Sequence, residues 1–101
     1  MITQDDIDAL CRDDVLDSAK ELINGDREKH YGTPQDNFDR IAKGWSVLLG
    51  VDVSKDQVAL CMAWLKIARL VNGPHVDSYI DAAAYMALAG ELSCIVKPPK
   101  L

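Results

Sequence analysis

The chain is 101 residues long, which is the size of one domain and leaves no room for a second hydrophobic core. Hydrophobic residues make up 49% of it, and its formal net charge is −5. Residues 1–24 carry seven acidic and two basic side chains, and residues 25–101 carry nine of each. This distribution argues against a nucleic-acid polymer as partner, because binding such a polymer requires a basic face.

The sequence also argues against a membrane partner. No apolar run approaches the roughly 20 residues that span a bilayer, and the first ten residues hold three aspartates and no basic residue, unlike a secretory signal. We therefore expect a cytoplasmic protein. Cys11, Cys61 and Cys94 have no metal-like spacing, and we expect them to be reduced and buried.

The first expected helix covers about residues 14–29. Asp13 or Asp14 can cap its N-terminus, and Gly25 weakens it near its end. One broad face is apolar and holds Val15, Leu16, Ala19, Leu22 and Ile23. Residues 2–10 form either a short separate helix or a frayed start.

The second expected helix begins with a strong start signal. Thr33 can be the N-cap, Pro34 suits the first turn, and Asp36 follows. Apolar residues then recur at helical spacing up to Gly50, where the helix ends: Phe38, Ile41, Ala42, Trp45, Leu48 and Leu49.

The third expected helix, over residues 55–71, follows a capping box formed by Ser54 and Gln57. Both of its faces are apolar, which predicts burial on both sides. In so short a chain, a second buried face suggests a contact between subunits. We therefore expect a homo-oligomer, a dimer or a tetramer, with three residues in the contact: Leu60, Trp64 and Ile67.

The last expected helix covers about residues 76–96, is rich in alanine, and is ended by Pro98 and Pro99. No alternating run or hairpin turn indicates a strand. The sequence thus predicts an all-α protein, a single domain over residues 1–101, with about four helices in a compact bundle.

Three polar clusters interrupt the apolar faces and are candidate binding sites. The first joins residues 30–32, with Tyr31, to Asn37 and Arg40, which are neighbours on one helix face. Arg40 can instead pair with Asp36 on a solvated surface.

The second cluster is Lys66 and Arg69, three residues apart in an otherwise apolar helix. Two cations there require counter-charges. A phosphate can supply them, and so can Asp77 and Asp81 in an internal network of ion pairs.

The third cluster consists of His75, Asp77, Ser78, Asp81 and Tyr85. Asp77 and Asp81 lie a turn apart and can hold a hard cation such as Mg²⁺, or accept hydrogen bonds from a base or a ribose. Alternatively, Asp77 caps its helix, and the Asp81 carboxylate forms an ion pair with Lys66 or Arg69 of the preceding helix.

Three motifs follow one another along the chain: GDREKHYGTPQDNFDRIA at 25–42, QVALCM and LKIARL within 57–70, and HVDSYIDAAAY at 75–85. Together they resemble a family of small phage and prophage proteins of unknown function, over about residues 13–92. The resemblance implies a viral or prophage origin, and it does not itself give an activity.

The last motif is also similar to the final metal-binding helix of MazG-like all-α nucleoside triphosphate pyrophosphohydrolases. That resemblance implies Mg²⁺ as cofactor, held by Asp77 and Asp81. Those enzymes supply further acids in a Glu-Glu-x-x-Glu motif, which this chain lacks. One or two carboxylates do not make the multi-acid site that attack on a phosphoanhydride needs.

The polar residues fit recognition of a nucleotide. The cations would bind phosphate, the carboxylates and Asn37 would bind base or ribose edges, and the aromatic residues Tyr31, Trp45 and Tyr85 would stack. We therefore expect a phage-type protein that has no catalytic residue and no cofactor.

Such a protein would sequester a nucleotide immune signal, for example a cyclic dinucleotide or an ADP-ribose derivative, without cleaving it. In the host cytoplasm it would thereby inhibit anti-phage defence. Two alternatives stay open: a divergent Mg²⁺-dependent pyrophosphohydrolase, and a non-catalytic adaptor between proteins.

Overall fold

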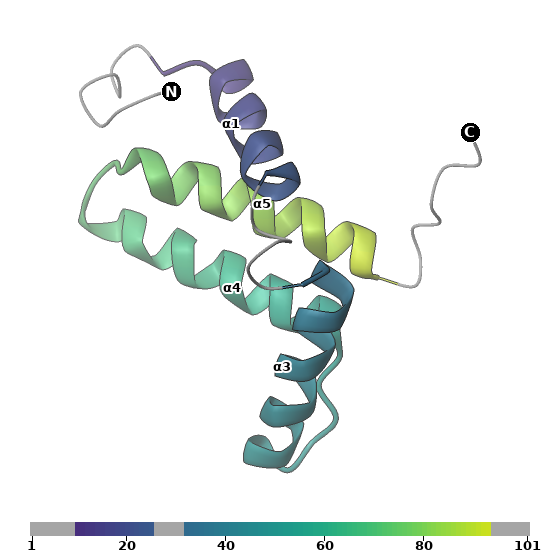
Figure 1. Cartoon of the computed structure of the whole chain (residues 1–101). Helices are drawn as coiled ribbons and strands as arrows, with labels where there is room; N and C mark the ends of the chain where they lie inside the picture. The colour runs from purple at the N-terminus through teal and green to yellow at the C-terminus, as the bar shows by residue number, and fades with distance from the viewer. Residues whose placement is uncertain (1–9, 26–31, 94–101) are drawn as a thin grey trace.

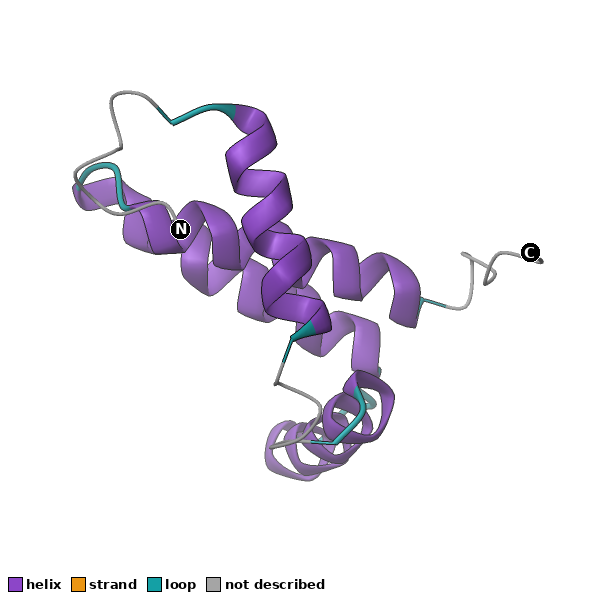
Figure 2. Cartoon of the chain, turned by 45° about the horizontal axis from the view of Figure 1, so that its top comes forward, coloured by secondary structure: helices purple, strands orange, loops and turns teal. Residues whose placement is uncertain are grey.

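The computed structural model describes residues 10–25 and 32–93, and it contains four α-helices (Figure 1). The helices are α1 (Arg12–Asn24), α3 (Pro34–Leu49), α4 (Lys55–Arg69) and α5 (Val76–Leu92). A single 3-10 turn, Leu70–Asn72, follows α4. No strand occurs in these two described ranges (Figure 2), which confirms the all-α prediction.

Helices α4 and α5 form an antiparallel pair on which the other two helices pack. The turn between them covers residues 70–75, and their contact is the most extensive in the molecule. Helix α1 lies against α5, whereas α3 packs across α4 and then extends away from the pair (Figures 1 and 2). None of the described helices is both long and apolar enough to cross a bilayer.

Two clusters of buried residues hold the helices together. The first cluster joins α3, α4 and α5 and consists of Phe38, Ala42, Val58, Ala59, Leu88, Ala89 and Leu92. The second cluster joins α1 to the N-terminal half of α5 and consists of Ala19, Val76, Ile80 and Ala84. Alanine makes up a large part of both, which allows the helix axes to approach closely but buries little apolar area per residue.

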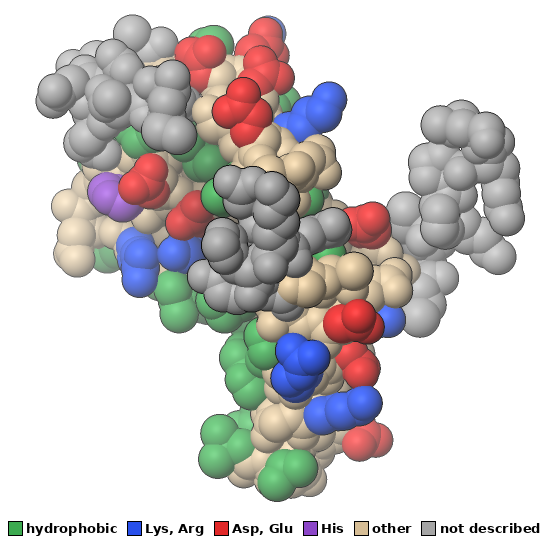
Figure 3. Space-filling model, in the orientation of Figure 1, with side chains coloured by type: hydrophobic (Ala, Val, Ile, Leu, Met, Phe, Trp, Pro, Cys, Tyr) green, Lys and Arg blue, Asp and Glu red, His purple; other side chains and the backbone are tan. Residues whose placement is uncertain are grey.

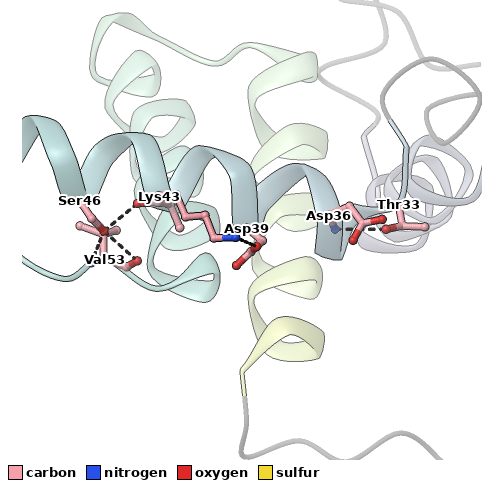
Figure 4. A network of polar contacts seen from close by, with 7 residues as sticks. Thr33, Asp36, Asp39, Lys43, Ser46 and Val53 are labelled. Atoms are coloured by element: carbon pink, nitrogen blue, oxygen red, sulfur yellow. Dashed lines mark hydrogen bonds and ion pairs between the residues drawn. The ribbon is translucent and has the colours of Figure 1, made fainter.

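The bounds of α3 agree with the sequence prediction. The Asp36 backbone N–H donates to Thr33 Oγ1 at 3.1 Å, and Pro34 occupies the first turn (Figure 4). Gly50 ends the helix with a φ of 71°, a left-handed conformation that glycine adopts without steric cost. The start of α4 is also confirmed, because the Ser54 N–H donates to Gln57 Oε1 at 2.9 Å.

Ser46 fastens the loop that leads from α3 to α4. Its hydroxyl donates to the Ala42 carbonyl at 2.8 Å and accepts from the Val53 backbone N–H at 2.8 Å (Figure 4). The second hydrogen bond connects positions seven apart and turns the chain back along α3. It thereby sets where α4 can begin.

Replacing Ser46 by alanine should lower the free energy of unfolding by about 1–2 kcal/mol, because the half-buried Val53 N–H loses its partner. Chemical denaturation of the variant measures this loss. Ser93→Ala is the control, since the Ser93 hydroxyl donates only to the Gly90 carbonyl one turn back, and an unpaired carbonyl there can still meet water. Equal losses for the two variants would mean that Ser46 does not fasten the loop.

Three expected helix ends were wrong. Helix α1 begins at Arg12 with Cys11 as its N-cap, so Asp13 and Asp14 lie in the first turn, where they favour the helix through its dipole and not as caps. It ends at Asn24, because Gly25 leaves helical geometry, with a ψ of −141°. Helix α5 ends at Leu92, because Ser93 is extended.

A fourth helix end differs as well: the α-helix of α4 ends at Arg69 and continues to Asn72 as the 3-10 turn. Cys61 on this helix is exposed, as is Cys11, contrary to the expectation that both are buried. Within one chain only one face of α4 is covered. The predictions for residues 2–9, 26–29 and 94–96 lie outside the described residues.

Candidate functional site

Lys66 and Asp81 form an ion pair where α4 and α5 pack together. Lys66 Nζ lies 3.1 Å from the Asp81 carboxylate, and the two side chains are 15% and 27% exposed. The antiparallel arrangement brings a residue near the end of α4 opposite one in the second turn of α5. Of the two counter-charges that the sequence left open for Lys66, a phosphate or a carboxylate, the structure supplies the carboxylate.

Arg69 and Asp77 lie at the same end of the α4–α5 pair, and both are exposed. Each is one turn closer to the connecting turn than its helix neighbour in the ion pair. In the parts of the chain that the structure describes, neither side chain has an ion pair or a hydrogen bond. The counter-charge predicted for Arg69 from Asp77 or Asp81 is therefore not seen in the described residues, and the guanidinium is open to solvent.

His75 and Ser78 are joined at the start of α5. His75 is the N-cap residue, and its Nδ1 lies 3.0 Å from the Ser78 hydroxyl. Ser78 is 1% exposed, so its side chain is part of the packing and does not face solvent. Asp77 is not the N-cap residue of this helix; it lies in the first turn.

Tyr85 lies further along α5, one turn beyond Asp81. Its ring meets Phe38 of α3 edge to face, with the centroids 6.3 Å apart and an interplanar angle of 79°. Trp45 is half-buried and packs against the same core cluster. Both aromatic rings thus take part in packing while remaining partly exposed, and their stacking on a base stays a prediction.

The first predicted cluster is only partly visible. Arg40 is exposed, Asn37 is half-buried, and Tyr31 lies outside the described residues. Arg40 and Asp36 do not form an ion pair in the described ranges. The ion pair on this helix is instead Lys43–Asp39 at 3.0 Å, with side chains 78% and 52% exposed (Figure 4).

The Lys43 ammonium lowers the pKa of Asp39, through its hydrogen bond and its charge. A carboxyl group with a lowered pKa stabilises the folded chain above its ordinary pKa, and this contribution disappears as the pH falls through the lowered value. Because the pair is open to water, it is a surface feature, distinct from the Lys66–Asp81 pair.

The structure thus brings together one group of predicted residues: Lys66, Arg69, His75, Asp77 and Asp81, at one end of the α4–α5 pair. Residues 10–25 and 32–93 contain no group of three or more His, Cys, Asp or Glu side chains placed to hold a metal ion. A separate open hollow of about 640 Å³ lies on α1, and the described residues that line it include none of the predicted site residues.

The exposed apolar residues at the end of α3 were not predicted from the sequence. Val47 and Leu48 are 85% and 81% exposed, and Val51 in the following loop is 61% exposed. The available signal was the absence of any charged residue over 44–51. Helical spacing alone assigned Leu48 to the covered face, because it cannot show where a neighbouring helix ends.

Comparison with known proteins gives a family and two relatives. Residues 14–93 match the model of a domain of unknown function, DUF6378. The chain is 42% identical over 73 residues to the gene 55 protein of Mycobacterium phage L5, and 43% identical over 72 residues to the gene 55 protein of Mycobacterium phage D29. Each alignment covers 70% of this chain, but the chain spans only about half of each relative, 47% and 48%. No solved structure matches the chain significantly.

Proposed function

The chain belongs to the DUF6378 family, whose function is unknown, and we propose that it acts as a nucleotide-binding protein that does not cleave its ligand. The region expected from the three motifs, residues 13–92, agrees with the matched region. The phage relatives support the phage origin that those motifs implied. The resemblance to MazG-like enzymes stays a prediction.

The observation that carries this proposal is the charged group at one end of the α4–α5 pair. Lys66 is held in place by Asp81 at 3.1 Å, while Arg69 is exposed one turn away. A guanidinium beside an ammonium suits a phosphate group, because the first gives two directed hydrogen bonds and the second a compact charge. Asp77 can accept hydrogen bonds from ribose hydroxyls or from the amino group of a base.

Binding without cleavage is proposed because the chain lacks the Glu-Glu-x-x-Glu motif that would complete a multi-acid Mg²⁺ site. In a phage, a protein that binds a nucleotide without consuming it is useful as a sink. The proposed ligand is a nucleotide immune signal of the host, such as a cyclic dinucleotide or an ADP-ribose derivative. Its removal in the host cytoplasm would inhibit defence.

A thermal-shift screen with cyclic dinucleotides, ADP-ribose and nucleoside triphosphates tests the proposal. A ligand of the protein should raise its melting temperature without added metal. At a ligand concentration of 100 times Kd, the free energy of unfolding should increase by about 2.7 kcal/mol. Chromatography should then recover that compound intact. Steady hydrolysis with Mg²⁺ that disappears in Asp81→Ala would instead establish the pyrophosphohydrolase alternative.

Arg69→Ala should weaken binding of the compound found in the screen by about 10- to 150-fold, which corresponds to the loss of about 1.5–3 kcal/mol for hydrogen bonds to a charged group. The melting temperature of the free protein should not change, since Arg69 is exposed and unpaired among the described residues. Lys43→Ala is the control and should bind normally. If no nucleotide binds and none is hydrolysed, the adaptor alternative replaces this proposal.

A further inference from the structure

The large apolar residues of this chain lie mostly outside its core. Among the residues that the structure describes, twelve hydrophobic ones are buried, half of them alanines, whereas thirteen large hydrophobic ones are exposed. A monomeric protein seldom exposes a continuous apolar patch of more than a few hundred Å². We therefore expect that part of this exposed apolar surface is buried by a binding partner.

Most of the exposed apolar residues lie on two neighbouring elements. On α4, a stripe at helical spacing consists of Leu60, Trp64, Ile67 and Val71, the last in the 3-10 turn, and Trp64 is 69% exposed. At the end of α3, Val47 and Leu48 are exposed. We name these six residues the α3–α4 face. Figure 3 shows hydrophobic side chains along the lower edge of α4 and down α3 to its free end.

The α3–α4 face is free of charge at its centre. No acidic or basic residue occurs at 44–51 or at 57–65, and Lys66 is turned away to its partner on α5. Depletion of charged residues is typical of the centre of a protein interface. Figure 3 shows one group of acidic side chains over α1 and others beside basic side chains along the flank of α3.

We propose that the α3–α4 face binds a second copy of this chain. The six residues of the face are 42–86% exposed, and three exposed apolar neighbours adjoin them: Leu49, Val51 and Leu65. At on the order of 100 Å² each, these nine residues present about 900 Å², which matches the ~800 Å² that each partner gives to a standard interface. In a two-fold dimer the same patch meets itself. A patch that meets itself must be self-complementary. An uncharged apolar patch is self-complementary, because it brings no like charges together across the two-fold axis.

The dimer would also bury large apolar residues that the single chain leaves exposed. Pairing two copies adds Trp64, Leu60 and Ile67 to a core that otherwise contains many alanines. Association then adds to the stability of the fold, because each chain buries further apolar area in the dimer. This inference is independent of the nucleotide site, which lies on side chains that do not belong to the face.

Sedimentation of the full chain tests the proposal. The chain has a mass of 11.1 kDa, and the main species at micromolar concentration should have twice that mass. Trp64→Glu should weaken association at least 100-fold. Leu16→Glu is the matched control, because Leu16 is 60% exposed but lies on α1, and this variant should remain a dimer. A monomer at these concentrations would overturn the proposal and leave the face to a different protein.

Two further measurements cover the case in which Trp64→Glu does not fold. The melting temperature of the unmodified chain should rise with protein concentration, whereas that of a monomer would stay constant. In Trp45→Phe, Trp64 is the remaining tryptophan, and its fluorescence should become protected from acrylamide as the concentration rises. A dimer in which Trp64 stays accessible to the quencher would show that another face is used.

Discussion

Replacing Phe38 by alanine is expected to lower the free energy of unfolding by about 3–5 kcal/mol. Phe38 is 2% exposed and is the one phenylalanine in the sequence. It packs in the cluster that joins α3 to α4 and α5, where most of its neighbours are smaller. Alanine would leave a cavity that these neighbours cannot fill, and the edge-to-face contact with Tyr85 would be lost.

The variants should form a graded series in urea or thermal unfolding. Phe38→Leu should cost less than about 1.5 kcal/mol, because it retains most of the volume. Arg40→Ala, at an exposed position of the same helix, should change stability by less than about 0.5 kcal/mol. Since a small domain has about 5–15 kcal/mol of stability in total, Phe38→Ala will bring the chain close to unfolding. A loss below 1 kcal/mol would contradict the role of Phe38 in fastening α3.

Replacing Lys66 by methionine should lower the free energy of unfolding by about 2–4 kcal/mol, somewhat less than the ~3–5 kcal/mol for a fully buried pair. Methionine keeps the length of the side chain but leaves the Asp81 carboxylate without its counter-charge at the α4–α5 contact. The loss is moderated because Asp81 is 27% exposed and can regain some water. Asp81→Asn in the same background should recover part of it.

The Lys43–Asp39 pair is a matched control for this experiment. Its atoms are as close, at 3.0 Å, but its side chains are 78% and 52% exposed. Lys43→Met should therefore change stability by less than about 0.5 kcal/mol. If the two lysine variants lose equal stability, the Lys66–Asp81 pair does not hold the helices together, and Lys66 is then available chiefly for a ligand.

The sequence was sufficient for elements whose ends carry their own chemical signals. Helix α3 has a side-chain cap at Thr33, a proline in its first turn and a left-handed glycine at its end, and its bounds were predicted correctly. The start of helix α1 was predicted less accurately, because two consecutive aspartates suit an N-cap and a first turn equally well. Helix α5 has Ser93 at its C-cap and its last glycine, Gly90, inside the helix, so the nearest prolines suggested an end that was too late.

The site could be predicted only as a set of alternatives. Spacing placed Lys66 and Arg69 on one side of α4, but the length of the turn at 70–75 decides which carboxylate each of them meets. The structure selects Asp81 for Lys66 and leaves Arg69 in solvent. Periodicity likewise showed that α4 is apolar on two sides, and it cannot tell a side covered by the same chain from one left for a partner.

The packing of α1 against α5 has a consequence for the order in which the chain is made. Helices α3, α4 and α5 contact their neighbours in sequence, whereas α1 is separated from the start of α5 by about 50 residues. On the ribosome α1 is therefore synthesised before the other described helices, although the helix that covers it is synthesised after them. At usual rates its apolar side waits about 3–10 s for α5. The rest of the helices can nucleate from local contacts, and α1 closes the loop at the end.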